Sequence, residues 1–236
     1  MRTINRWLTD MRNLLAPSAC SCCDARLIEH EHLLCTACQL ELPRTHYAYA
    51  PTENKMAQLF WHQLPIERAA ALFFYEGLSA AAQIIYDIKY RDRPDKAYQL
   101  GLLSATELAD SGFFKDIDFI VPVPLAPKRQ AERGYNQAEE LALGLSHGTG
   151  IAVNSHCVKR CLFNGSQTQL GHWGRADNVK GSFVATNTTT IEGRHILLVD
   201  DVCTTGATLI ACGQAITAVA HVRISIFTLA VSAKIR

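Results

Sequence analysis

One stretch of the chain runs Val199-Asp200-Asp201-Val202-Cys203-Thr204-Thr205-Gly206-Ala207-Thr208. The apolar run at 196–199 leads into it, and a continuous apolar run of this kind is typical of a parallel strand buried on both faces. A helical pattern from about 207 to 219 follows. The order of strand, tight loop and helix predicts one unit of an α/β protein, in which the loop at the carboxyl end of the strand borders the ligand crevice.

The residue types in this stretch suit a ribose 5-phosphate. The adjacent carboxylates of Asp200 and Asp201 can accept hydrogen bonds from vicinal hydroxyls such as those of a ribose. The loop that follows offers backbone N–H groups at a helix N-terminus, where a phosphate is stabilised. This 204–208 loop consists of Thr204, Thr205, Gly206, Ala207 and Thr208. The alternative is structural, with two acids that end a strand and a turn that caps a helix.

The rest of the second half of the chain repeats the alternation of strands and helices. Apolar patterns predict strands at 68–75, 119–123 and 222–231, and helices at 79–90, 95–110 and 136–146. This alternation predicts a parallel sheet with helices on both faces. The polar segment 163–179 has little apolar periodicity and is long enough to indicate a mobile functional loop.

A basic segment lies between two of these elements. A strand that ends near Pro124 leads into a predicted loop, after which a helix begins near residue 136. Cations and a helix N-terminus can converge here on one anion, and pyrophosphate fits that description. The residues that we expect to bind it are Lys128, Arg129, Arg133, Asn136 and Gln137. The alternative is an exposed basic turn without a ligand. Lys89-Tyr90-Arg91 ends an earlier helix. This cluster either has a functional role or reflects the general preference for cations at a helix C-terminus.

Five of the nine cysteines lie between Cys20 and Cys38. Two pairs of the form Cys-x-x-Cys, at Cys20/Cys23 and Cys35/Cys38, have the spacing of a structural zinc site with four thiolate ligands. Clustered reduced cysteines and a redox role are the alternatives. Cys22 is an additional thiol beside the first pair, and Asp24 stands where a turn would favour glycine.

The chain of 236 residues is long enough for one full domain and a small module. We expect an N-terminal helix and zinc module at 1–43, a linker at 44–65 and an α/β domain at 66–236. Residues 4–15 have an apolar helical face that we expect to pack on the body of the protein, with a membrane surface as the alternative.

The net charge of +1 argues against a generally basic, DNA-coating surface, and no apolar run approaches the roughly 18 residues that cross a bilayer. We therefore expect a cytoplasmic protein.

These motifs resemble two known patterns. Asp200-Asp201 followed by Thr204-Thr205-Gly206-x-Thr208 resembles the phosphoribosyl pyrophosphate signature of type I phosphoribosyltransferases. Val121-Pro122-Val123-Pro124-Leu125 and Arg133-Gly134-Tyr135-Asn136-Gln137-Ala138 resemble the ComF family, whose usual form has Phe at the position of Tyr135. Gln167, Arg175 and Asn178 stand at the family's spacing and are implied to belong to the mobile loop. His172-Trp173-Gly174 is an unusual insert there.

The resemblance implies a type I phosphoribosyltransferase-like fold behind a zinc module, with Mg²⁺ on bound phosphoribosyl pyrophosphate. It implies a reaction in which a base displaces pyrophosphate at the anomeric carbon while Asp200 and Asp201 bind the ribose. It also implies that the protein takes part in DNA uptake, natural transformation or the processing of imported nucleotides. No element for recognising the acceptor base is evident in the sequence.

A non-catalytic competence factor that uses the same crevice for single-stranded DNA is the alternative function. Its other partner would be a DNA-uptake helicase or another competence protein, which would place the chain peripherally at the inner face of the membrane. For this alternative, eight cations could border one crevice: Arg91, Arg93, Lys128, Arg129, Arg133, Lys159, Arg160 and Arg175. Against it, the sequence shows no stripe of interleaved arginines and aromatic residues of the kind that stacking platforms use.

Overall fold

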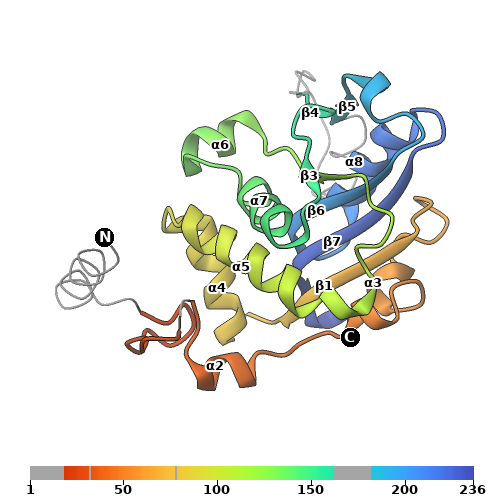
Figure 1. Cartoon of the computed structure of the whole chain (residues 1–236). Coiled ribbons are helices and arrows are strands. Elements are labelled where there is room, and N and C mark those ends of the chain that lie inside the picture. The colour runs from red at the N-terminus through yellow and green to blue at the C-terminus, as the bar shows by residue number, and fades with distance from the viewer. Residues whose placement is uncertain (1–18, 32, 78, 162–181) are drawn as a thin grey trace, which may run out of the picture.

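Five parallel strands form the central sheet of the protein, in the order β1-β7-β6-β2-β3 (Figure 1). The computed structural model describes residues 19–31, 33–77, 79–161 and 182–236. The strands are β1 (Arg68–Tyr75), β7 (Arg223–Ser232), β6 (His195–Cys203), β2 (Phe119–Pro122) and β3 (Ala152–Val153). β6 is buried along most of its length, as its apolar sequence predicts. This sheet confirms the predicted α/β class.

Helices cover both faces of the sheet (Figure 1). One face packs against α4 (Ala80–Tyr90), α5 (Pro94–Glu107) and α7 (Gln137–Thr149), and the other against α3 (Lys55–Gln58) and α8 (Ala207–Thr217). The remaining elements are α2 (Thr36–Glu41), α6 (Pro127–Arg133), the antiparallel pair β4 (Val158–Arg160) and β5 (Phe183–Ala185), and short 3-10 turns at Tyr47–Tyr49, Ala109–Ser111, Thr188–Thr190 and Ala233–Ile235.

α5 and α7 approach each other closely because glycines lie where they cross. A Cβ atom added to Gly144 would lie 2.0 Å from the carbonyl oxygen of Tyr98 on α5. One added to Gly101 would lie 2.2 Å from the carbonyl oxygen of Leu141 on α7. Both distances are far below van der Waals contact, so the two helices pack backbone against backbone. This contact fixes α7, whose N-terminus borders the candidate site.

The segment 44–65, which we expected to form a linker, packs against the sheet. The backbone N–H of Phe74 donates to Pro43 at 2.8 Å, and that of Ala69 donates to Pro51 at 2.8 Å, so the chain follows β1. Met56, Phe60 and Leu64 are buried in the core on the α3/α8 face. Apolar side chains in a polar stretch therefore contribute to the α/β core.

The cysteine-rich module contacts the domain through α2 and α5. Arg44 donates to the carboxylate of Glu107 on α5, with Nε at 3.0 Å from Oε2, and also to the carbonyl of Gln39. The Gln39 side chain reaches the same carboxylate at 3.2 Å. These bonds hold the end of α2 against the last turn of α5.

The helix expected over 4–15 and the loop expected over 163–179 lie outside the described residues. Gln167, Arg175 and Asn178 therefore have no described position. Among the residues that the structure does describe, no helix is both long enough and apolar enough to cross a membrane.

Candidate functional site

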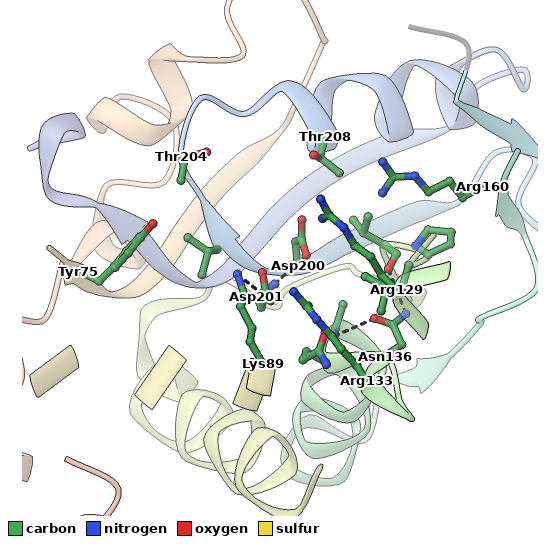
Figure 2. Close-up of a pocket in the computed structure, with 16 residues that line it drawn as sticks. Tyr75, Lys89, Arg129, Arg133, Asn136, Arg160, Asp200, Asp201, Thr204 and Thr208 are labelled. Atoms are coloured by element: carbon green, nitrogen blue, oxygen red, sulfur yellow. Dashed lines mark hydrogen bonds and ion pairs between the residues drawn. The ribbon is translucent and has the colours of Figure 1, made fainter. Parts of the chain in front are cut away.

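A cavity of about 480 Å³ lies at the carboxyl ends of β2 and β6 (Figure 2). β2 and β6 are neighbouring parallel strands, so the loops that follow them lie at the same edge of the sheet. This edge is where α/β proteins bind ligands. The residues that line it are Tyr75, Lys89, Val123, Pro124, Leu125, Arg129, Arg133, Asn136, Gln137, Ala138, Arg160, Asp200, Asp201, Val202, Thr204 and Thr208. Most of the predicted site residues are thus brought together.

The acid pair Asp200 and Asp201 stands near the end of β6. The backbone N–H of Asp201 donates to the Asp200 carboxylate at 2.9 Å, which fixes that side chain. Burial, with a further contribution from the Asp201 charge, raises the pKa of Asp200 to about 7. Lys89 and Arg160 oppose this shift. Near neutral pH, the Asp200 carboxyl group is therefore partly protonated.

Lys89 reaches the acid pair from the last turn of α4. Its Nζ lies 3.2 Å from Oδ2 of Asp201, and both side chains are largely shielded from solvent (Figure 2). From the sequence, Lys89 was either part of a functional Lys89-Tyr90-Arg91 cluster or a cation favoured at a helix C-terminus. The ion pair depends on a contact between residues 112 positions apart (201 minus 89), which no local pattern reveals.

The basic segment is a helix, α6, and not the loop that we predicted. Pro127 begins it and Gly134, in the left-handed conformation, ends it, as these residue types favour. Arg129 and Arg133 are four residues apart and therefore share one helix face, which lines the cavity. Lys128 projects from another part of α6 and is not among the lining residues.

The start of α7 is tied to the end of β2. The Asn136 side chain caps α7 by accepting from the backbone N–H of Ala138 at 3.2 Å, while its Nδ2 donates to the carbonyl of Val123 at 3.1 Å. Arg133 donates to Oε1 of the buried Gln137 at 2.8 Å. These bonds place Arg133 and the N-terminus of α7 together beside the acid pair (Figure 2).

The 204–208 loop lies above the acid pair and leads into α8. Thr204 and Thr208 line the main cavity, while Thr205, Gly206 and Ala207 border a smaller hollow of about 30 Å³ against β6. Gly206 has φ +77°, which a residue with a Cβ adopts only with strain. The loop therefore curves tightly enough to present its backbone at the N-terminus of α8.

Two more residues line the cavity: Tyr75, which we did not predict, and Arg160, which we expected there only as a cation of the DNA-binding alternative. Arg160 lies on β4, with its guanidinium 5.1 Å from the ring centre of Phe183 on β5. Burial and the nearby Arg129 lower its pKa, whereas Asp200 raises it. Two arginines thus face the same space, an arrangement that an anion would stabilise.

The four predicted zinc ligands form one cluster. The sulfur atoms of Cys20, Cys23, Cys35 and Cys38 all lie within 4.8 Å of one another, and those of Cys23 and Cys35 are 3.7 Å apart. Sulfurs that share a tetrahedral Zn²⁺ at about 2.3 Å are about 3.8 Å apart, so the cluster could hold this metal.

The backbone around the cluster supports the predicted choice of ligands. The N–H groups of Cys22 and Cys35 donate to Sγ of Cys20 at 3.4 and 3.3 Å, as expected for a thiolate ligand. Cys22 does not belong to the cluster. Asp24 has φ +57°, which confirms that the turn after the first pair requires the conformation glycine favours.

Residues 131–234 match the phosphoribosyl transferase domain model. With the parallel sheet, the helices on both faces and the four-cysteine cluster, this match defines a type I phosphoribosyltransferase-like fold behind a cysteine module.

The chain is 28% identical over 212 residues to the DNA utilization protein YhgH of Salmonella typhimurium, and the match covers 88% of each. It is 42% identical over 91 residues to competence protein F of Haemophilus influenzae, covering 38% of this chain and 40% of that protein. It is 36% identical over 113 residues to competence protein ComFC of Bacillus subtilis, covering 42% and 38%. These similarities confirm the predicted resemblance to the ComF family.

Proposed function

We propose that the cavity binds phosphoribosyl pyrophosphate with Mg²⁺ and that the protein transfers the phosphoribosyl group to a base. One observation carries this proposal: the acid pair, the 204–208 loop and the arginines Arg129 and Arg133 line one cavity. A ligand with a diol and two phosphate groups matches this set of acceptors and donors.

Each part of the ligand has a matching set of groups. The 5-phosphate accepts hydrogen bonds from the N–H groups and hydroxyls of the 204–208 loop, at the positive end of α8. The ribose hydroxyls donate to Asp200 and Asp201. The diphosphate accepts hydrogen bonds from Arg129, from Arg133 and from the backbone N–H groups at the N-terminus of α7. Mg²⁺ bound with the ligand would be held by ligand oxygens and water, and would neutralise part of the diphosphate charge.

The chemistry follows from this placement. A ring nitrogen of the base attacks the anomeric carbon, and the bond from that carbon to the diphosphate oxygen breaks with its electron pair on the diphosphate. Positive charge develops on the ribose, where the adjacent carboxylates stabilise it. The arginines stabilise the negative charge on the departing pyrophosphate. Release of pyrophosphate with a panel of bases, each incubated with phosphoribosyl pyrophosphate, Mg²⁺ and protein, tests turnover and identifies the acceptor.

The names of the relatives, which concern competence and DNA utilization, support a role in handling imported DNA or its nucleotides. The four cysteines, clustered as thiols rather than paired in disulfides, are consistent with a reducing cytoplasm and with a structural Zn²⁺. We place the protein in the cytoplasm, where it would contact the membrane only through partner proteins.

Calorimetry tests the proposed ligand. The exposed Asp110, on a distant 3-10 turn, is the matched control for loss of one carboxylate. We expect Asp200→Ala and Asp201→Ala each to weaken binding of the Mg²⁺ complex by about tenfold or more, because hydrogen bonds to charged groups contribute roughly 1.5–3 kcal/mol. Asp110→Ala should bind as the wild type does, and Lys128→Ala should lose less than either acid variant. Unchanged affinity in both acid variants would refute the ribose contact.

A second candidate function is binding of single-stranded DNA in the same crevice. Four cations line the cavity, namely Lys89, Arg129, Arg133 and Arg160, against two acids. Strand phosphates and pyrophosphate would compete for these cations, and the binding should weaken steeply with added salt. Filter binding of a short single strand across a salt series, with and without phosphoribosyl pyrophosphate, tests this candidate. Binding that is indifferent both to salt and to the small ligand would contradict it.

A further inference from the structure

An aromatic and cationic surface lies beside the cavity, although the sequence showed no stripe of this kind. Tyr86 and Tyr90 are one turn apart on α4, are 50% and 64% exposed, and have ring centres 5.1 Å apart. Arg91 lies 5.7 Å from the centre of the Tyr86 ring, and Arg133 lies 5.4 Å from that of Tyr90. Because Arg133 comes from α6, the stripe joins two helices, and inspection of the linear sequence could not detect it.

This surface is continuous with the candidate site. A second cavity of about 500 Å³ lies between the end of α4 and α6, and Tyr90 lines it. Its other lining residues are Lys89, Asp92, Arg129, Glu132 and Arg133. Lys89, Arg129 and Arg133 line the main cavity as well. A ligand could therefore extend from the acid pair to the tyrosines along one row of cations.

We propose that Tyr86 and Tyr90 form a stacking platform for a base of single-stranded nucleic acid, whose neighbouring phosphate binds Arg129 and Arg133. Exposed aromatic rings offer flat π faces, and proteins that bind single strands combine such rings with a basic groove. The two rings are tilted by 43° and touch each other, so a base stacks on their outer surface and not between them. Arg91 and Arg133 add cation–π and phosphate contacts at either ring.

A strand fits this surface better than a free base does. The two adjacent rings have a guanidinium group at each end, Arg91 at Tyr86 and Arg133 at Tyr90, so a phosphate next to a stacked base would have a cation nearby. A free base would cover a ring but leave the arginines without an anion. Among the described residues, Lys89 and Arg91 are ion-paired with Asp201 and Asp87, whereas Arg129 and Arg133 form no ion pair. The second cavity therefore has two arginines that can bind a phosphate.

The inference deepens the second candidate function and rests on it, but not on the proposed transferase activity. Fluorescence anisotropy with a labelled oligothymidylate of about 12 nucleotides, and with an abasic strand of equal length, separates base contacts from phosphate contacts. The double variant Tyr86→Ala/Tyr90→Ala removes both rings. Tyr49, which is 62% exposed on a separate 3-10 turn, provides the control Tyr49→Ala.

We expect the double variant to bind oligothymidylate about tenfold more weakly, as loss of base stacking predicts, and to bind the abasic strand as the wild type does. Tyr86→Phe/Tyr90→Phe and Tyr49→Ala should keep wild-type affinity. Equal binding of both strands by the wild type, or oligothymidylate binding that is unchanged in the double variant, would overturn the platform. Displacement of the strand by thymidine 5'-monophosphate at equal nucleotide concentration would assign the rings to a free nucleotide and overturn the strand as its occupant.

Calorimetry of the double variant with phosphoribosyl pyrophosphate and Mg²⁺ provides the independent readout. Wild-type affinity there, together with weakened strand binding, supports the platform. If the wild type fails to bind phosphoribosyl pyrophosphate but shows the expected difference between strands, the platform stands and the proposed transferase function falls.

Discussion

The ammonium group of Lys89 lies 3.2 Å from the carboxylate of Asp201 and joins the end of α4 to the end of β6. One member of the acid pair is therefore ion-paired before any ligand arrives. The other, Asp200, accepts a backbone N–H and has its pKa raised to about 7 by burial and by the neighbouring charge. The two carboxyl groups thus have different partners, although they are adjacent in the sequence.

Asp200 should make stability fall as pH rises. Its folded pKa of about 7 exceeds the ordinary value of 3.8, so between these values the folded state binds more protons than the unfolded state does. Its contribution is therefore favourable at low pH and lost as pH rises toward and through about 7. We expect Asp200→Asn to be more stable than the wild type at pH 8 by about 1–2 kcal/mol, or roughly 2–8 °C in Tm, and to show a flatter pH dependence. Thermal unfolding at pH 5 and pH 8 measures both.

Removal of the Lys89 charge should act on both acids. Lys89→Met leaves Asp201 without its ion-pair partner in a partly buried place, which we expect to lower the free energy of unfolding by roughly 1–3 kcal/mol. It should also raise the pKa of Asp200 further, because Lys89 lowers it in the wild type. Carboxyl carbon NMR across a pH titration measures this shift. Lys128→Met, on the outer part of α6, serves as the control, and an unshifted Asp200 in Lys89→Met would contradict the coupling.

The cysteine cluster should hold one Zn²⁺ per chain. Elemental analysis of the purified protein measures the stoichiometry. Because Cys20 accepts two backbone N–H groups within the cluster, Cys20→Ser should lose most of the metal, whereas Cys22→Ser should retain it. A metal-free, stably folded wild-type module would refute the site, and loss of metal in Cys22→Ser would change its ligand set.

The close approach of α5 and α7 should tolerate no additional methyl group. Gly144→Ala places a Cβ 2.0 Å from a backbone oxygen, so the helices must separate, at a cost of about 1–3 kcal/mol. Gly77, whose added Cβ would meet nothing within 4 Å, provides the control Gly77→Ala. Chemical denaturation of both variants measures the difference, and equal stabilities would show that the helix pair adjusts freely.

The sequence predicted the strands and helices well wherever their apolar patterns were strong. The apolar run at 196–199 predicted β6. The spacing of the cysteines predicted a cluster of four thiols, to which Cys22 does not belong. α6 was missed because its seven residues are mostly polar and offer no apolar face; the signals available were Pro127 at its start and Gly134 at its end.

The contacts that complete the site could not be predicted from local patterns. Lys89 and Arg160 reach Asp200 and Asp201 from distant segments, and only the packing of α4 and β4 around the sheet brings them there. Tyr90 and Arg133 meet in the same way across two helices. The burial of Phe60 was hidden because the polar residues and prolines around it indicated a linker.

A crystal structure of the protein with phosphoribosyl pyrophosphate and Mg²⁺ tests the central claim most directly. We expect the 5-phosphate on the 204–208 loop, the ribose hydroxyls within hydrogen-bond distance of Asp200 and Asp201, and the diphosphate between Arg129 and Arg133. A ligand that binds outside this crevice, or with its diphosphate on the 204–208 loop, would contradict the account.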